Sequence, residues 1–289
     1  MAEQAHPPET AEGWYALHQV FSIERRALRG VAREDLDRMK KSAGGRLARL
    51  VGAASTGESK QPGWSAVVSL IGSDSDVMFV HFRESLDALG DAQAALAGEP
   101  LFDFLLPKYS FLSVTEAGFY HITADAAREA LATGGTVGDP AYRARVAGRV
   151  QAELESAHVK QRLYPLRPPD MPYVSFYPMS KRREPDQNWY ALTLAERSRL
   201  MIAHGLVGRQ YAGKVVQVIT GAVGLSAWEW GVTLFARDPL EFKRILTDMR
   251  FDEVSANYAD FGDFYVGRIT PPERWVQGLL SGTGAPSDA

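Results

Sequence analysis

The sequence of 289 residues contains no cysteine. This absence excludes a disulfide scaffold, a cysteine nucleophile, and any zinc, iron–sulfur or CxxCH-attached haem site that depends on thiolates. An excess of charge is also missing, since 32 Lys and Arg stand against 35 Asp and Glu. The resulting net charge of −3 offers no footprint for nucleic acid or for an anionic membrane, so we expect neither as a partner.

Long hydrophobic runs are absent as well. No apolar run approaches the roughly 18 residues that a membrane span needs, and the polar start MAEQAHPPETAEG lacks the hydrophobic core of a signal peptide. The motifs GxxxxGK[ST], GxGxxG, HExxH and GxSxG do not occur, which disfavours nucleotide hydrolysis, dinucleotide binding, zinc proteolysis and serine hydrolysis. We expect a cytoplasmic enzyme or binding protein.

The pattern of elements is the strongest feature that is present. With 45% hydrophobic and 23% charged residues the chain is typical of a folded protein, and its length suggests two domains. Hydrophobic periodicity predicts the order strand–helix–strand–strand–helix–strand twice, which is the ferredoxin-like order. We therefore predict an α+β fold of tandem ferredoxin-like repeats, with two antiparallel sheets and helices on their outer faces.

The predicted boundaries follow from the same pattern. In the second half a helix begins at Thr193, where Thr193 and Glu196 form a capping box. The predicted divisions are an N-terminal half (13–122), a linker with some helix (123–168), a C-terminal half (169–270) and loose termini (1–12 and 281–289). The predicted elements are strand 13–23, helix 33–51, strands 64–71 and 76–82, helix 84–97, strand 109–120, linker helix 142–157, strand 172–181, the helix from Thr193, strands 214–220 and 227–236, helix 238–249 and strand 263–269.

His204 is the most informative single residue. It shares a helix face with Leu200, Met201 and Tyr211, which favours an ordinary core histidine. Gly205 and Gly208 follow within one turn, and each glycine costs a helix about 0.8–1 kcal/mol relative to alanine. Close approach of a flat ligand would explain these glycines, and so would close contact between the helix and the sheet.

Gln217 interrupts an apolar strand, KVVQVIT. Both sides of this strand are apolar, so we expect it to be covered on both faces. A buried amide has to be hydrogen-bonded. Its partner is a neighbouring strand, a buried water or, if there is a cavity, a bound ligand.

Tyr177 and Lys181 lie on the same face of the strand PYVSFYPMSK, about 13 Å apart. A phenol and an ammonium that face inward would suit a large anionic ligand, whereas an edge strand with a solvated lysine is the simpler alternative. Trp228 and Trp230 alternate with Glu229 and predict a strand with one strongly apolar face. Arg250 ends its helix, where a cation suits the helix dipole without any function.

The residues from Tyr177 to Gly267 resemble the chlorite dismutase-like haem proteins and, within them, the coproheme decarboxylases, which are peroxide-dependent haem synthases. The resemblance is carried by YPMSKRR (177–183), NWY (188–190), LMIAHGLVGRQYAGKVVQVITG (200–221), WEWGVTLFA (228–236) and LEFKRILTDMRFDEVSANYADFGDFYVG (240–267). In the first half only GWYALH (13–18) and the order of elements resemble the family. The resemblance implies a fold of the dimeric α+β barrel type, a haem site in the second half and a homopentamer.

The resemblance also implies roles for particular residues. His204 matches the proximal iron ligand, Tyr177 the tyrosine that becomes a radical, and Lys181 the lysine beside the reacting propionate. Gln217 matches a distal glutamine where chlorite dismutases place an arginine, which argues against chlorite as substrate. Other matches to the site that binds haem or coproheme are Arg162, Pro178, Met179, Ser180, Trp230, Arg250 and Ser255; Ser180 stands where relatives more often have Asn or Asp.

The activity that the resemblance implies is oxidation of iron-coproporphyrin III (coproheme) by hydrogen peroxide, with propionates 2 and 4 lost as CO2 to leave the vinyl groups of haem b. Coproheme is then both substrate and redox centre, and the protein supplies position and charge. A ferrochelatase is a possible transient partner. A haem-binding carrier or sensor is one alternative, and a chlorite dismutase- or peroxidase-like enzyme is another.

Overall fold

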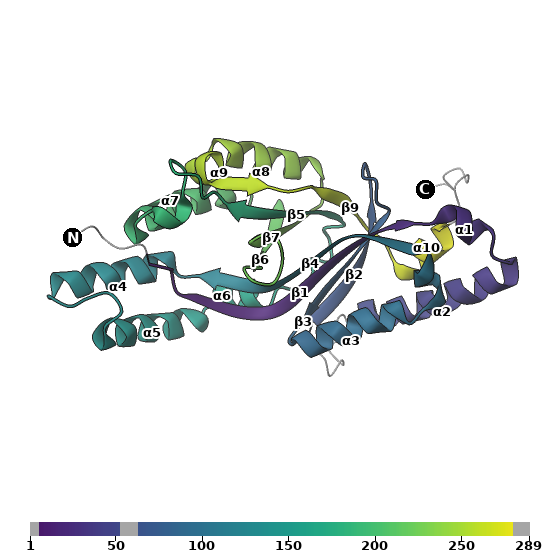
Figure 1. The fold of residues 1–289 in the computed structure, drawn as a ribbon, viewed down its shortest axis with the longest axis horizontal. Coiled ribbons are helices and arrows are strands. Elements are labelled where there is room, and N and C mark those ends of the chain that lie inside the picture. The colour runs from purple at the N-terminus through teal and green to yellow at the C-terminus, as the bar shows by residue number, and fades with distance from the viewer. Residues whose placement is uncertain (1–5, 53–62, 280–289) are drawn as a thin grey trace. The chain divides into compact units, whose positions relative to one another are not determined.

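The computed structural model of the chain describes residues 6–52 and 63–279 (Figure 1). The predicted loose terminus at 281–289 lies outside the described residues. In chain order, the helices and strands are β1 (Thr10–Ile23), α1 (Arg25–Arg29), α2 (Arg33–Gly52), β2 (Gly63–Leu70), β3 (Val77–Arg83), α3 (Leu86–Ala97), η1 (Pro100–Phe104), β4 (Leu105–Gly118), α4 (Tyr120–Ala132), α5 (Pro140–Leu154), α6 (Ala157–Leu163), β5 (Tyr173–Lys181), η2 (Trp189–Ala191), α7 (Leu194–Arg209), β6 (Val215–Gly221), β7 (Trp230–Ala236), α8 (Leu240–Phe251), α9 (Glu253–Tyr258), β8 (Ala259–Phe261), β9 (Tyr265–Ile269) and α10 (Pro272–Gly278).

The predicted order of elements is confirmed. It appears first as β1, α2, β2, β3, α3, β4 and again as β5, α7, β6, β7, α8, β9, so the fold is α+β with repeated ferredoxin-like order. The capping box at the start of α7 is also present, because the Thr193 side chain accepts from the Glu196 N–H and the Glu196 side chain accepts from the Thr193 N–H. Local sequence signals were sufficient for both features.

Residues 123–168 contain more helix than their sequence predicts. Helix α4 occupies the Ala-rich stretch directly after β4, whereas the only helix that we assigned to this linker was at 142–157. The single helix predicted at 142–157 is divided into α5 and α6. The division occurs because the Ser156 side chain accepts from the Val159 N–H and so caps a new helix.

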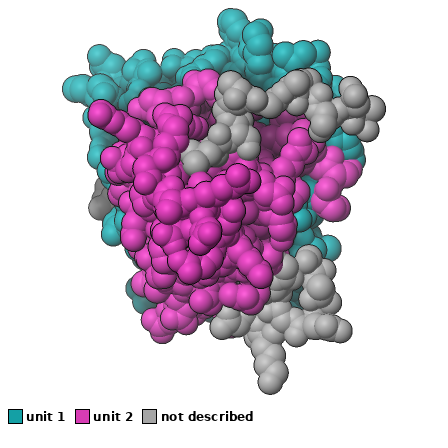
Figure 2. All heavy atoms as spheres, turned by 90° about the vertical axis from the view of Figure 1, so that its right-hand side faces the viewer, with its two compact units in different colours: residues 1–13, 114–168, 177–263 teal, residues 14–113, 169–176, 264–289 magenta. Residues whose placement is uncertain are grey.

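By its contacts the chain divides into two compact units (Figure 2). Unit 1 is Met1–Gly13, Val114–Pro168 and Tyr177–Asp263, and unit 2 is Trp14–Ser113, Pro169–Phe176 and Phe264–Ala289. Each unit therefore draws on both sequence halves, and strands β1, β4 and β5 each pass from one unit to the other. The halves at 13–122 and 169–270 correspond to the two copies of the repeated order of elements. Their division into separate domains stays a prediction.

Unit 2 is built on antiparallel pairings of β1 with β3, β3 with β2, β2 with β9 and β9 with the first residues of β5. Helices α2, α3 and α10 supply the apolar side chains that cover one face of these strands. Val67, Val77 and Phe79 of the sheet contact that layer, which includes Leu47 of α2 and Trp275 of α10.

In unit 1, β6 pairs with β7 and with the end of β4, and β5 pairs with β8. Helices α7, α8 and α9 contact one another (Figure 1), and α8 also contacts β7. A separate apolar cluster joins α4, α5 and α6 to the start of α7. These elements carry every residue predicted for the site.

The expectation that β6 is covered on both faces is wrong for unit 1. The side chains of Gln217 and Ile219 are exposed, while their neighbours Val218 and Thr220 are buried. Ile219 is apolar and yet exposed, so the apolar composition of β6 is not evidence that both of its faces are buried. The result leaves a partly apolar strand face open next to α7.

Among the described residues, no helix is both long enough and apolar enough to cross a bilayer.

Candidate functional site

All of the residues predicted for the site belong to unit 1. Arg162 lies in its segment 114–168 and the others lie in its segment 177–263. They come from α6, β5, α7, β6, β7, α8 and α9. Their geometry can therefore be described within one compact body.

His204 is held by a buried carboxylate. Its Nδ1 lies 2.7 Å from Oδ2 of Asp252, whose side chain is 3% exposed. The same Oδ2 accepts from the Ser255 N–H at 3.2 Å, because Asp252 is the N-cap of α9. With Nδ1–H donated to the carboxylate, Nε2 keeps its lone pair and is the nitrogen available to a metal.

The two glycines that follow His204 have different surroundings. A Cβ at Gly208 would lie 3.3 Å from Met249 Cε and 3.4 Å from Gln217 Nε2, so this glycine permits close contact between α7 and its neighbours. A Cβ at Gly205 would meet nothing within 4 Å. Close contact explains Gly208, whereas Gly205 borders open space.

Gln217 and His204 are brought together through Gly208. The side-chain amide of Gln217 reaches α7 at Gly208, about one helical turn from His204. Gln217 and Ile219 stand on the exposed face of β6. The Gln217 amide thus contacts the same helix that carries His204.

Tyr177 is buried, with 6% of its surface exposed. Its ring lies 5.8 Å from that of Phe261, and the guanidinium of Arg250 lies 3.8 Å from the Phe261 ring centroid on that residue's face. Burial raises the pKa of the Tyr177 phenol, and the charge of Arg250 opposes this shift. The phenol is therefore neutral, and Phe261 contacts both its ring and the Arg250 guanidinium.

Lys181 has its amine over an aromatic ring. Nζ lies 4.4 Å from the centroid of the Trp189 ring, and Trp189 is buried. Burial lowers the pKa of the Lys181 amine to about 8, while the carboxylates of Asp252 and Glu229 oppose the shift. An amine with this pKa gives up a proton readily near neutral pH, as a general acid must.

The end of β5 is fixed by Glu229. The Lys181 N–H donates to Glu229 Oε2 at 2.8 Å, and the Glu229 N–H donates to Ser180 Oγ at 3.2 Å. Our reading of WEW as an ordinary strand is thus wrong: Glu229 is buried, both tryptophans are partly exposed, and β7 begins only at Trp230. The acid turns inward because its carboxylate accepts from the Lys181 N–H of β5 and from the Arg183 guanidinium.

Arg162 and Trp230 are connected by Glu116 of β4. Burial and the charge of Glu12 raise the pKa of the Glu116 carboxyl, while a hydrogen bond from Trp230 and the charge of Arg162 lower it. The charge of Glu116 in turn opposes the effect of burial on the pKa of Arg162. The structure thus joins two of the predicted residues through one that we did not predict.

Among the remaining predicted residues, Pro178 and Met179 present backbone carbonyls to partners within unit 1. Pro178 accepts from the Gly262 N–H at 2.9 Å and Met179 from the Glu229 N–H at 3.1 Å. Ser255 is buried in the first turn of α9. Their proposed contacts with a ligand stay predictions.

Sequence reasoning missed five residues that organise the site: Glu116, Trp189, Glu229, Asp252 and Phe261. Asp252 carried a usable signal, since Asp is a preferred helix N-cap residue and the acidic Glu253 follows in the first turn. Glu229 did too, because an acid inside an apolar run indicates a buried contact. Nothing in the sequence pairs either one with its partner.

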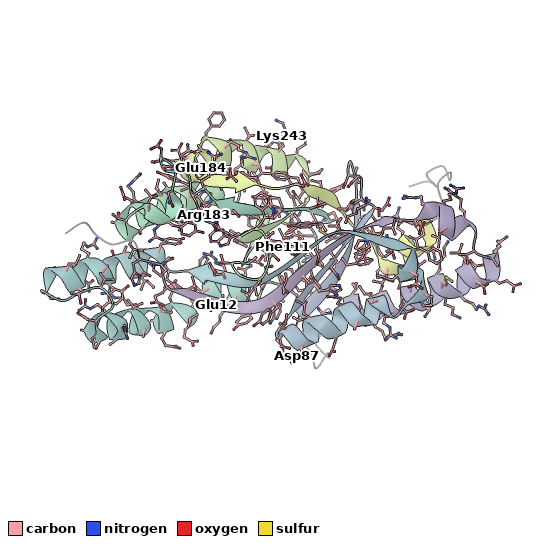
Figure 3. All side chains as sticks on the ribbon, viewed as in Figure 1. Glu12, Asp87, Phe111, Arg183, Glu184 and Lys243 are labelled. Atoms are coloured by element: carbon pink, nitrogen blue, oxygen red, sulfur yellow. The ribbon has the colours of Figure 1, made fainter. Side chains whose placement is uncertain are left out.

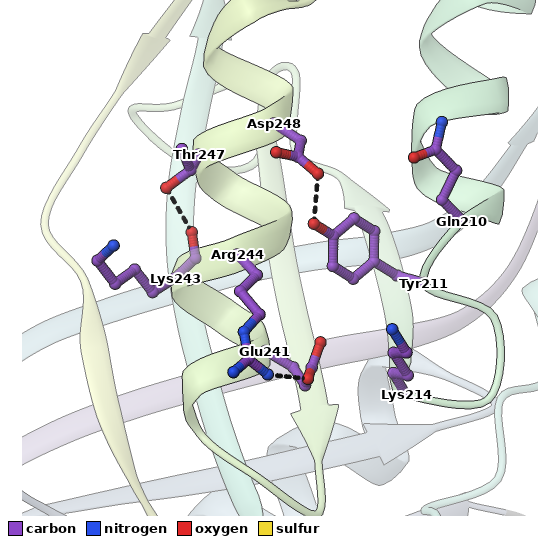
Figure 4. A pocket seen from close by; sticks show the side chains of 8 residues that line it. All are labelled: Gln210, Tyr211, Lys214, Glu241, Lys243, Arg244, Thr247 and Asp248. Atoms are coloured by element: carbon purple, nitrogen blue, oxygen red, sulfur yellow. Dashed lines mark hydrogen bonds and ion pairs between the residues drawn. The ribbon is translucent and has the colours of Figure 1, made fainter.

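A pocket of about 310 Å³ lies elsewhere in unit 1 (Figure 4). It is bounded by the end of α7 and the first turns of α8, and it contains none of the predicted residues. Its groups largely satisfy one another: the Tyr211 hydroxyl donates to Asp248 Oδ2 at 2.5 Å, which raises the Tyr211 pKa to about 12, and Arg244 pairs with Glu241. We place no reaction there.

Within residues 6–52 and 63–279, no group of three or more His, Asp or Glu side chains could hold a metal ion. A haem iron requires only one side chain from the protein, and His204 would supply it. Cations at Lys181, Arg250 and Arg162 would suit the carboxylates of such a ligand.

Comparison with known proteins agrees with this chemistry. A model of the family described as "Chlorite dismutase" matches residues 40–270. The coproheme decarboxylase of Staphylococcus carnosus is 38% identical over 266 residues, which are 92% of this chain and 95% of that protein. A solved structure of a heme-binding protein from Thermus thermophilus has a TM-score of 0.79 and 36% identity, covering 96% of this chain and 99% of the other.

More distant structures share the fold. A mutant chlorite dismutase from Candidatus Nitrospira defluvii has a TM-score of 0.67 at 17% identity, and the alignment covers 94% of this chain and 97% of that one. At this identity the likeness concerns the fold alone.

Proposed function

Because the chain belongs to the chlorite dismutase family, we propose that it is a coproheme decarboxylase, which uses hydrogen peroxide to convert iron-coproporphyrin III to haem b. The observation that supports this most strongly is the arrangement around His204: a histidine oriented by a carboxylate shares one unit with a buried tyrosine and a half-buried lysine. The protein that is 38% identical over most of the chain is a coproheme decarboxylase.

The residues of unit 1 fit this substrate. Asp252 leaves Nε2 of His204 for the iron, and Gly205 borders space that a flat macrocycle needs. Arg250, Lys181 and Arg162 would pair with propionates, since a buried carboxylate without a partner is costly. Bound coproheme supplies the oxidising chemistry once peroxide reacts with it.

The proton balance gives Lys181 a role. Each propionate carboxylate that becomes a vinyl group and CO2 releases two electrons and one proton. Reduction of one peroxide to two waters takes two electrons and two protons, so one further proton is consumed per propionate. We assign its supply to the Lys181 ammonium, whose pKa of about 8 suits that transfer.

Tyr177 is assigned the hydrogen abstraction. Its phenol is buried and neutral, so it can lose an electron and a proton together and become a tyrosyl radical. That radical would take a hydrogen atom from the propionate carbon. Gln217 would contact peroxide through hydrogen bonds, without the positive charge that would favour an anionic oxidant such as chlorite.

A homopentamer, a cytoplasmic location and transient contact with a ferrochelatase complete the proposal. They rest on the resemblance to the coproheme decarboxylases. Size-exclusion chromatography with light scattering measures the first of them directly, and a monomer would remove the pentamer from the proposal.

The activity is tested by mixing purified protein with iron-coproporphyrin III and hydrogen peroxide and identifying the porphyrin by mass. We expect two successive losses of CO2 with two hydrogens, and no loss when peroxide is omitted. A haem-binding carrier is the second candidate, because the Thermus relative is described as a heme-binding protein. Tight binding with unchanged porphyrin mass would favour that candidate.

A further inference from the structure

The last three residues of β5 pair with β8, and each of them also contacts Glu229. Glu229 donates its N–H to the Met179 carbonyl at 3.1 Å and to Ser180 Oγ at 3.2 Å. Its carboxylate Oε2 accepts from the Lys181 N–H at 2.8 Å. Ser180 thus has a structural partner, which explains a residue that the sequence left without an interpretation.

Glu229 is itself well fixed. Its carbonyl accepts from the Ala222 N–H at 2.7 Å, which closes the connection between β6 and β7. Its side chain is 7% exposed, and its second carboxylate oxygen pairs with the guanidinium of Arg183, labelled in Figure 3. A buried carboxylate with a donor on each oxygen is held in one orientation.

The amine end of Lys181 is held separately. Nζ lies over the Trp189 ring of η2, 4.4 Å from its centroid. Burial disfavours the charged form of this amine. The carboxylates of Glu229 and of Asp252, at the start of α9, favour the charged form. Arg183 and Tyr190 also face Glu229, so its charge is shared between Lys181 and these two residues.

We propose that Glu229 is the positioning residue of Lys181: its carboxylate holds the Lys181 backbone so that the side chain leaves β5 toward Trp189, and its charge keeps the ammonium in that site. The inference rests on the proposed function only for what the ammonium does there. The placement of Lys181 is a property of the protein without any ligand, and it can be measured without turnover.

The test uses the ligand-free protein and trace acetylation with acetic anhydride across pH, with Lys181 labelling followed by peptide mass spectrometry. In the parent protein we expect Lys181 to titrate near pH 8. Glu229→Gln keeps an oxygen for the Lys181 N–H and removes the charge, so the amine stays buried and its pKa falls by up to about one unit. Glu229→Ala also removes the backbone contact, so the amine swings into water and titrates toward about 10.4.

These opposite shifts separate positioning from a merely structural contact. Unchanged profiles, or shifts of both variants in the same direction, would overturn the proposal. If Glu229→Ala does not fold, the Gln variant decides alone: a lowered pKa supports the proposal and an unchanged one refutes it. Glu253→Gln is the matched control, since Glu253 pairs with Arg199 on the surface and its loss should leave Lys181 unchanged.

The activity assay then distinguishes a failure of the proposed function from a failure of the positioning role. If the parent protein does not decarboxylate coproheme but the labelling shifts appear, the proposed function fails and the positioning role stands. If the parent is active and the shifts are absent, only the positioning role fails.

Discussion

Asp252 and Glu229 are buried carboxylates that serve the two basic side chains of the site. Asp252 orients the His204 imidazole, and Glu229 holds the Lys181 backbone. A buried charge is tolerated only with partners, and both acids have donors from backbone and side chain. Substitutions at these two positions should therefore affect the properties of the histidine and the lysine more than the overall fold.

Asp252→Asn tests the first of these contacts. Asparagine also caps helices well, so α9 should persist and stability should change by less than about 1 kcal/mol. The lost charge should weaken the basicity of His204 and lower the iron–histidine stretching frequency of the ferrous coproheme complex in resonance Raman spectra. Asp248→Asn is the control, because Asp248 binds Tyr211 instead, and an equal frequency change in both variants would contradict the role of Asp252.

Tyr177→Phe should separate binding from turnover. The ring is buried and is retained, so coproheme should bind within roughly tenfold to a hundredfold of the parent affinity. Phenylalanine cannot give up a phenolic hydrogen, so decarboxylation should stop or fall by several orders of magnitude while the porphyrin slowly bleaches. Titration by absorbance and product mass measure the two effects; haem b made at the parental rate would refute the radical assignment. Tyr211→Phe, outside the predicted site, should remain active.

Helix α7 shows how an element prepares a site. Its start is set by the capping box at Thr193, and its middle carries His204 between Leu200, which is buried, and two glycines. Glycine weakens a helix, so the cap has to contribute part of the lost stability. The Thr193 cap and His204 therefore belong to one helix, which forms cooperatively.

Thr193→Ala should lower the free energy of unfolding by about 1 kcal/mol, because the Glu196 N–H loses its acceptor. Urea unfolding should show a lower midpoint with an unchanged slope. Thr247→Ala is a suitable control, since Thr247 is exposed within α8 and its hydroxyl donates only to the Lys243 carbonyl. Equal losses of unfolding free energy in the two variants would mean that the Thr193 cap does not stabilise α7 more than an ordinary helical threonine does.

The two glycines of α7 should respond differently to alanine. Gly205→Ala meets open space, so the ligand-free protein should gain up to about 1 kcal/mol of stability. If the space receives the substrate, coproheme affinity should fall at the same time. Gly208→Ala would press on Met249 and Gln217, so its stability gain should be smaller or reversed. Affinity unchanged by Gly205→Ala would show that coproheme does not approach there.

At the scale of the whole molecule, both compact units bury polar groups. Unit 1 contains the charged groups of the site. Unit 2 contains His18 and His81, both fully buried, with His18 stacked on Phe176 at 4.1 Å and His81 Nδ1 at 2.8 Å from Ser65 Oγ. Burial lowers the pKa of each imidazole to about 3, and for His81 the charges of Arg83 and His18 contribute to this shift.

These histidines predict sensitivity to acid. Above pH 6.5 they are neutral in both the folded and the unfolded chain and cost nothing. As the pH falls from 6.5 toward 3 the unfolded chain takes up protons that folded unit 2 refuses, so stability decreases, by about 2 kcal/mol per histidine at pH 5. Urea unfolding at pH 7, 6 and 5 measures the slope. His81→Gln should reduce it, and an unchanged slope would mean that His81 is protonated in the folded unit.

The sequence by itself determined the order of elements and the capping box of α7, because each depends on neighbours a few positions apart. The match of particular residues to a haem site stays a prediction. The reading of burial from the sequence was weaker: β6 proved open on the face of Gln217, and Glu229 proved buried between its tryptophans. Periodicity reports which residues share a face and does not report what covers that face.

Only the tertiary structure decided which groups act on one another. The Asp252–His204 and Glu229–Lys181 contacts each join residues 48 positions apart, and Glu116 meets Arg162 and Trp230 from a different part of the chain again. Such pairs form when elements with their own local signals come into contact, and the pKa of each group follows from the burial and charges found there. The residue types of the site were therefore readable in the sequence, whereas their protonation and orientation were set by the fold.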